Sequence, residues 1–265
     1  MSTPNSTKDL NTQEKEEKGI LAKNKKMMTA AIAVAILALG VFGFQQFYLQ
    51  PKEDKAQTNL TLGLQYLEEG ENLNAQVLNL SSAPDSVLTD SVKNQIETFK
   101  QMATDQYNKA LNGDGKFPGY LKLANESMTD AANIAVANAG LCYFNLGNFK
   151  EAIKYLEKFS AKSDKGLSAQ YVAALANSYA SDNQIDKAIA TFKKAAEVAD
   201  NAITSPQYLL EAGLLLESQQ KPAEALDIYK SIKSKYPSST LVAPQQVQVG
   251  AYAALIDKYI ERVSK

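Results

Sequence analysis

The feature that most constrains this chain is an uncharged stretch from Met27 to Gln50, which is almost wholly apolar as far as Phe44. A helix of this length, at about 1.5 Å per residue, crosses the hydrocarbon core of a bilayer, which is about 30 Å thick. A buried helix in a soluble core ordinarily carries a polar stripe, and residues 30–41 carry none. The sequence therefore predicts one transmembrane anchor over residues 23–50.

The charges on the two sides of this stretch predict its orientation. Lys18, Lys23, Lys25 and Lys26 precede it, whereas residues 51–55 carry both signs in balance. Positive charge is retained on the cytosolic side of a membrane, so the N-terminus is expected in the cytosol and the bulk of the chain across the membrane.

A cleavable signal peptide is the alternative to an uncleaved anchor. Its charged region would extend over residues 1–26, and the apolar run is longer than the usual core of about 7–15 residues. We therefore favour the anchor. Residues 1–22, rich in Ser, Thr, Asn, Lys and Glu, are expected to form a disordered cytosolic tail.

The composition argues against catalysis. Histidine is absent, Cys142 is the single cysteine, and the commonest general base and metal ligand are thereby missing. The net charge is −1, from 28 basic and 29 acidic residues, so no basic surface points to nucleic acid. We expect no enzyme activity, no cofactor, no metal and no nucleic-acid partner.

The C-terminal half contains a repeated pattern of small and large residues. Its alanine recurs at 152, 188 and 225, at intervals of 36 and 37 residues, close to the 34 of tetratricopeptide (TPR) repeats. Small residues let two helices approach closely, and the larger ones fill the space around that contact. The repeat-packing residues are Gly140, Tyr143, Ala152 and Leu156; Ala176, Tyr179, Ala188 and Phe192; and Gly213, Leu216, Ala225 and Tyr229.

The expected fold is all-α: a single N-terminal transmembrane helix, then a TPR-like α-solenoid of helical hairpins with a C-terminal capping helix. Upstream of the clear repeats, amphipathic helices are predicted at 57–69, 91–111 and 117–125. The predicted divisions are a degenerate first-repeat region at 51–130 with a loop insertion around 80–90, repeats at about 133–165, 169–201 and 206–238 within 131–265, and a cap at 245–263.

TPR domains usually bind partners on the concave face formed by the first helix of each hairpin. The register predicts these groove positions: Ile134, Ala137, Leu141, Phe144 and Asn145; Gln170, Ala173, Asn177 and Ala180; and Gln207, Leu210, Leu214 and Glu217. Some TPR domains grip a C-terminal carboxylate with lysine and asparagine, but Ala173 stands where that lysine would be. Extended or helical segments of proteins are therefore the expected ligands.

Three smaller motifs resemble functional sites. Residues 112–115 fail as a calcium loop, because Leu121 stands where the bidentate glutamate belongs, and a helix stop is predicted instead. Cys142, among apolar neighbours, is expected to be a buried thiol. The triplets at 85–87 and 90–92 have an Asp-Ser-Val form that some bacterial O-glycosylation systems modify, and their modification is left open.

The layout as a whole resembles the YfgM-type family, in the version found in Bacteroidetes-type bacteria. The resemblance rests on residues 47–51, 110–115 and 140–152, and residues 70–98 depart from it. It implies a bacterial inner-membrane protein with a periplasmic TPR domain, bound to SecYEG translocon subunits, periplasmic folding factors or exported chains. The alternative is an adaptor in envelope or cell-wall assembly. The oligomeric state is left open.

Overall fold

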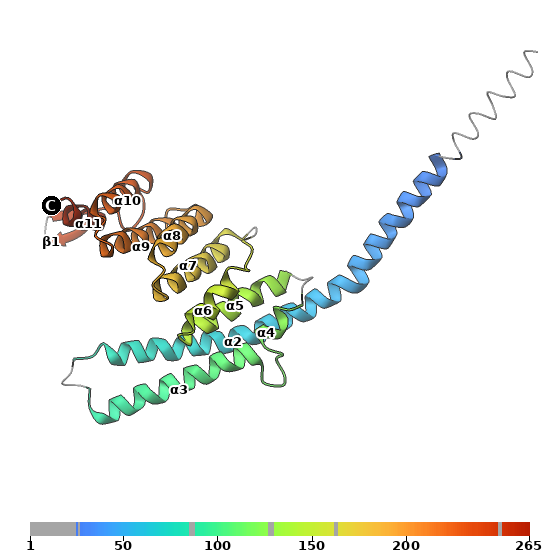
Figure 1. Cartoon of the computed structure of the whole chain (residues 1–265), viewed down its shortest axis with the longest axis horizontal. Helices are drawn as coiled ribbons and strands as arrows, with labels where there is room; N and C mark the ends of the chain where they lie inside the picture. Colours follow the sequence, from blue (N-terminus) through green and yellow to red (C-terminus); the bar gives the residue numbers. More distant parts are fainter. Residues whose placement is uncertain (1–24, 26, 85–87, 127–129, 162–163, 249–250) are drawn as a thin grey trace, which may run out of the picture. The chain divides into compact units, whose positions relative to one another are not determined.

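The computed structural model describes residues 25, 27–84, 88–126, 130–161, 164–248 and 251–265 (Figure 1). The expected tail at 1–22 and the triplet at 85–87 lie outside the described residues. The chain divides into two units, Met1–Lys55 and Ala56–Lys265.

The apolar stretch is helical, as predicted. The helix Met27–Ser81 contains an 18-residue window with a mean hydropathy of 2.3, none of which is buried, so it is long and apolar enough to cross a membrane. A π-helical turn, η1 (Gln45–Leu49), ends the apolar part. There the Tyr48 ring stacks on Phe44 with 5.0 Å between centroids, and Lys52 donates to the Tyr48 hydroxyl at 3.0 Å.

Three helices precede the repeats. They are α2 (Gln50–Ser81), α3 (Asp90–Asn112) and the short α4 (Tyr120–Leu123). From Ala56 onward, α2 packs on α3 and α4 in one apolar cluster. Gly70 allows close approach, because a β-carbon there would lie 2.5 Å from the ring of Tyr107. The helix expected at 117–125 is only one turn long, and Phe117 instead packs edge-on against Tyr120, with 5.4 Å between ring centroids.

The predicted helical hairpins are present in sequence order along the body (Figure 1). They are α5 (Asp130–Asn145) with α6 (Phe149–Leu156), α7 (Lys165–Ser181) with α8 (Ile185–Ala199), and α9 (Ser205–Ser218) with α10 (Pro222–Lys235). The first helices therefore begin one to four residues earlier than the groove register assumed.

Each hairpin turns in the same way. The residues with positive φ are Gly147 at 74°, Asn183 at 60° and Gln220 at 57°. The amide of the next residue donates to a carbonyl five residues back, at 2.9 Å from Asn148, 2.8 Å from Gln184 and 3.0 Å from Lys221. These are Schellman motifs, which satisfy the last carbonyls of a helix and stop it. The three hairpins thus share a backbone motif as well as a repeated pattern of side chains.

Small residues lie where the helices of each hairpin cross. Ala152, Ala188 and Ala225 are all 0% exposed. In the first hairpin, a β-carbon on Gly140 would lie 2.5 Å from Cγ of Leu156. The helices therefore approach too closely there for a larger side chain to fit without movement.

The C-terminal segment differs from the helix expected at 245–263. Strands β1 (Gln245–Gln248) and β2 (Ala251–Ala253) form an antiparallel pair with an irregularity between Gln246 and Gln248, and the helix α11 is Leu255–Val263. Glutamine and β-branched valine alternate after Pro244, and a period of two favours a strand over a helix.

The α11 helix covers the end of the repeats. Ile256 is 0% exposed, and its amide donates to the Leu241 carbonyl at 2.8 Å. The Arg262 guanidinium donates to both carboxylate oxygens of Glu217, at 2.8 and 2.7 Å. A bidentate pair of this kind fixes orientation as well as contact.

Candidate functional site

The predicted groove positions differ from hairpin to hairpin in their exposure. On α5, Ala137 is 0% exposed, and the ring of Phe144 packs on Phe149 with centroids 5.7 Å apart. Ile134 and Leu141 are half-buried and pack against two apolar clusters. The α5 positions thus contribute chiefly to packing.

The later hairpins offer more accessible groove positions. Gln170 and Asn177 on α7 and Gln207 on α9 are exposed, whereas Ala173 is buried. The remaining positions are half-buried: Asn145, Ala180, Leu210, Leu214 and Glu217. Glu217 already binds Arg262 and the Tyr229 hydroxyl, so its carboxylate is engaged within the fold. The exposed groove positions are thus uncharged amides.

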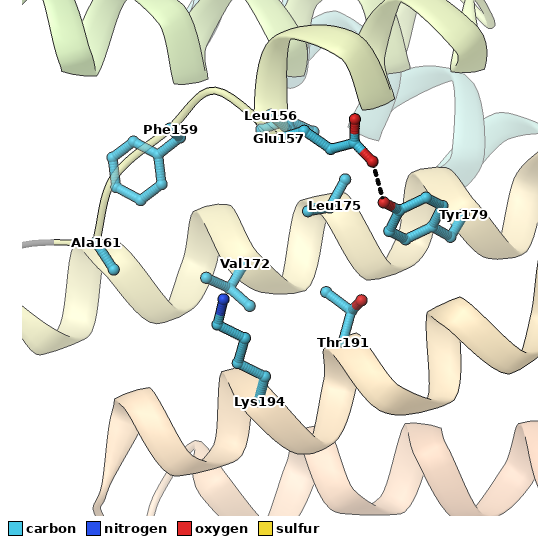
Figure 2. A pocket seen from close by; sticks show the side chains of 9 residues that line it. All are labelled: Leu156, Glu157, Phe159, Ala161, Val172, Leu175, Tyr179, Thr191 and Lys194. Carbon is cyan, nitrogen blue, oxygen red and sulfur yellow. Dashed lines mark hydrogen bonds between the residues drawn. The ribbon is translucent and has the colours of Figure 1, made fainter.

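A pocket lies elsewhere on the second hairpin, and we call it the α7 pocket (Figure 2). Its volume is about 300 Å³. It is lined by Leu156, Glu157, Phe159, Ala161, Val172, Leu175, Tyr179, Thr191 and Lys194. These residues come from the end of α6, the linker after it, α7 and α8.

The α7 pocket is on the opposite side of α7 from the exposed groove positions Gln170 and Asn177. An α-helix turns by about 100° per residue, so Val172, Leu175 and Tyr179 share one face of α7. By the same count, Gln170 and Asn177 point the other way. The molecule therefore presents two separate surfaces on the same helix.

The linker that walls the α7 pocket is held by specific contacts. The Asn133 side chain bonds both backbone groups of Ser160, donating to its carbonyl and accepting from its amide, each at 2.9 Å. Phe159 packs edge-on against Tyr171 with 4.8 Å between ring centroids, and the Tyr171 hydroxyl donates to the side-chain oxygen Oδ1 of the buried Asn138 at 2.6 Å. The wall is thus fixed to both α5 and α7.

Polar groups stand at two places around the apolar lining. Tyr179 donates a hydrogen bond to Glu157, and burial, followed by this bond to a carboxylate, raises the pKa of Tyr179 to about 12. In Figure 2 the Lys194 ammonium lies beside Val172, and Leu175 lies between it and the Glu157–Tyr179 pair in this view. Within the described part of the chain, no acidic side chain forms an ion pair with Lys194.

The sequence reasoning missed the α7 pocket. Of its lining, only Leu156 and Tyr179 were singled out, and both were assigned to repeat packing. Val172, Leu175 and Tyr179 do recur at helical spacing, but such spacing is also that of a core face. The linker carries no periodic signal at all.

The loop once compared with a calcium site is a helix stop, as predicted. Gly113 has φ of 88°, and its amide donates to the Lys109 carbonyl at 2.8 Å. The Asp114 carboxylate accepts from the amides of Phe117 at 2.8 Å and Lys116 at 2.9 Å. These bonds, with one from Tyr66, lower the pKa of Asp114 to about 2. Among the described residues, no group of three His, Cys, Asp or Glu could hold a metal.

Comparison with known families agrees with the hairpin geometry. Residues 135–159 and 173–240 match models of the tetratricopeptide repeat. No curated protein matches the chain. The chain therefore carries TPR repeats, and arrays of this kind present extended surfaces for binding other proteins. This supports a protein-interaction scaffold attached to a helix long and apolar enough to cross a membrane.

Proposed function

We propose that this protein is a single-pass anchor in the bacterial inner membrane whose TPR body binds segments of other proteins in the periplasm. Its partners are subunits of the Sec translocon, periplasmic folding factors or exported chains, and it acts by binding rather than by catalysis. The observation that carries the proposal is the combination of an apolar helix beginning at Met27 with TPR repeats at 135–159 and 173–240. The family resemblance supplies the choice of partners.

The groove positions are the proposed binding surface. Gln170, Asn177 and Gln207 offer amide donors and acceptors at exposed sites on two successive hairpins. Ala173, where a carboxylate-binding lysine would stand, is buried. Uncharged amides pair with the free backbone groups of an extended segment or with polar side chains of a helical one, so the chain end need not be recognised.

Photocrosslinking in living cells tests this surface. A photoreactive residue at Gln170 or Gln207 should capture translocon subunits, folding factors or secretory precursors. The control is the same residue at Ala190, which is exposed on α8. Capture of one unrelated envelope complex from the groove positions would instead establish an adaptor in envelope or cell-wall assembly. Equal capture from Gln170, Gln207 and Ala190 would show that the groove positions are not a specific binding surface.

The orientation requires a separate test. The lysines before the span support a cytosolic N-terminus. A protease added to spheroplasts should then degrade the chain from Lys52 onward and leave the N-terminal side protected. Protection of the repeats would reverse the proposed orientation.

A further inference from the structure

We propose that the α7 pocket is a second docking site, which takes an apolar side chain of a partner protein together with a neighbouring carboxylate. The groove positions are on the other face of α7, so this site goes beyond the proposed function. A partner could occupy it while the groove is free.

The apolar residues that line the α7 pocket are the reason for proposing an apolar side chain on the ligand. Val172 is 8% exposed and Leu156 2% exposed, and Leu175 and Phe159 are half-buried around the same space. About 300 Å³ is at the lower end of the range for ligand sites. A space of this size suits one or two aliphatic side chains rather than a large cofactor.

Lys194 is the reason for proposing a carboxylate on the ligand. Its side chain is exposed and lines the pocket together with Val172, and among the described residues it has no acidic partner (Figure 2). A carboxylate placed there would form a charge-assisted hydrogen bond with the ammonium at the edge of the apolar lining.

Glu157 sets the direction in which the ligand lies. Its Oε1 accepts from the Tyr179 hydroxyl, and Oε2 is left to accept from a backbone N–H of the ligand. A ligand carboxylate at this end would be repelled. The ligand acid therefore belongs at the Lys194 end, with the apolar side chain over Leu175 between the two charges.

The site is already formed before a partner arrives. Asn133 holds the linker at Ser160 through two hydrogen bonds, and the Tyr171 ring fixes Phe159. A wall that needs no ordering costs less conformational entropy on binding. This favours recognition of a short segment despite the small contact area.

Methyl NMR of the full chain in lipid nanodiscs tests the proposal. The probes are acetyl-Ala-Leu-Asp-Ala-amide and acetyl-Ala-Ala-Leu with a free terminal carboxylate. Saturable shifts are expected at the methyl groups of Val172 and Leu175. The tighter of the two peptides identifies whether a side-chain or a terminal carboxylate is preferred.

Matched variants separate the charge from the fold. Lys194→Met keeps most of the aliphatic stem and removes the cation, and should weaken binding about three- to tenfold. Lys193→Met, at the neighbouring exposed residue outside the lining, should leave it unchanged. A peptide with asparagine in place of aspartate should lose affinity for the wild type and not for Lys194→Met.

Two results would overturn the proposal. One is the absence of saturable shifts at Val172 and Leu175 up to the solubility limit of both peptides. The other is equal affinity of wild type and Lys194→Met for the peptides, which would show that Lys194 does not bind the carboxylate of the ligand. Shifts confined to the methyl groups of the groove positions Ala180, Leu210 and Leu214 would also count against the α7 pocket, while still supporting the groove.

Discussion

The ring of Tyr229 lies against the backbone of Gly213, so closely that a β-carbon on Gly213 would be 2.3 Å from Cε1. The ring has no room to retreat, because it is 0% exposed and its hydroxyl donates to Glu217. This contact joins α9 to α10 in the third hairpin, at the crossing that the repeat pattern placed there.

Gly213→Ala should therefore destabilise the protein by about 1–3 kcal/mol through overpacking, although alanine is the better helix former by about 1 kcal/mol. The measurement is urea unfolding of the full chain in detergent. Gly166→Ala on α7 is the control, since among the described atoms its β-carbon would meet Oδ1 of Asp164 alone, at an ordinary 3.5 Å. The control should be neutral or stabilising, and equal behaviour of both variants would contradict the close contact.

Two glycines in the loop after α3 allow the cost of backbone strain to be separated from the cost of a steric clash. Gly113 and Gly115 both have positive φ, at 88° and 93°. A β-carbon on Gly113 would lie 2.3 Å from the Phe117 carbonyl oxygen, whereas one on Gly115 would meet no atom of the described residues within 4 Å. Gly115→Ala should cost about 1 kcal/mol from backbone strain, and Gly113→Ala considerably more. Thermal unfolding of the two variants in parallel measures the difference, and a smaller cost at Gly113 would show that the loop can rearrange.

The Glu217–Arg262 pair should make stability depend on pH. Desolvation raises the pKa of Glu217, but the stronger combined effect of hydrogen bonds from Arg262 and Tyr229 holds it below the usual 4.5. The stabilisation is then complete above pH 4.5 and is lost as pH falls through the folded-state pKa. Unfolding midpoints in urea should fall with acidification in the wild type, and less steeply in Glu217→Gln. Asp90→Asn, at a side chain that is 99% exposed, should follow the wild type. A Glu217→Gln curve parallel to the wild type would exclude this linkage.

Cys142 should be inert in the folded protein. The side chain is 0% exposed, and burial, with a smaller effect of Glu71, raises the pKa of its thiol well above the usual range. A thiol-reactive dye at about pH 8 should label it more than about 100-fold more slowly in the native than in the denatured protein. Ala190→Cys, at an exposed position on α8, should label at once. Rapid labelling of native Cys142 would mean that the cluster between α3 and α5 opens readily.

The hairpins could be predicted because their packing repeats in the sequence. Each crossing requires a small residue at a fixed distance from the next, and each first helix ends in the same backbone motif. The strands at residues 245–248 and 251–253 could not be predicted in this way, since Val247 and Val249 are two residues apart, as in a strand, whereas Val249, Tyr252 and Ile256 are spaced by three and four, as in a helix. In a segment this short, neither period is decisive.

The binding surfaces were predictable to different degrees. The groove positions follow from the repeat register alone, and their role as a binding site stays a prediction. The α7 pocket depends on where an irregular linker runs, and that path is set by contacts such as Asn133 with Ser160 across the first hairpin. No local pattern in the sequence encodes a contact between residues so far apart.

Both ends of the repeat array are covered by elements of a different kind. At one end α3 and α4 pack on α5, and at the other α11 packs on α10, held by Arg262. A helical array with bare ends could add further copies of itself and grow into a filament. Here the number of stacked hairpins is set within each chain, because these elements occupy the surfaces on which a further hairpin would stack.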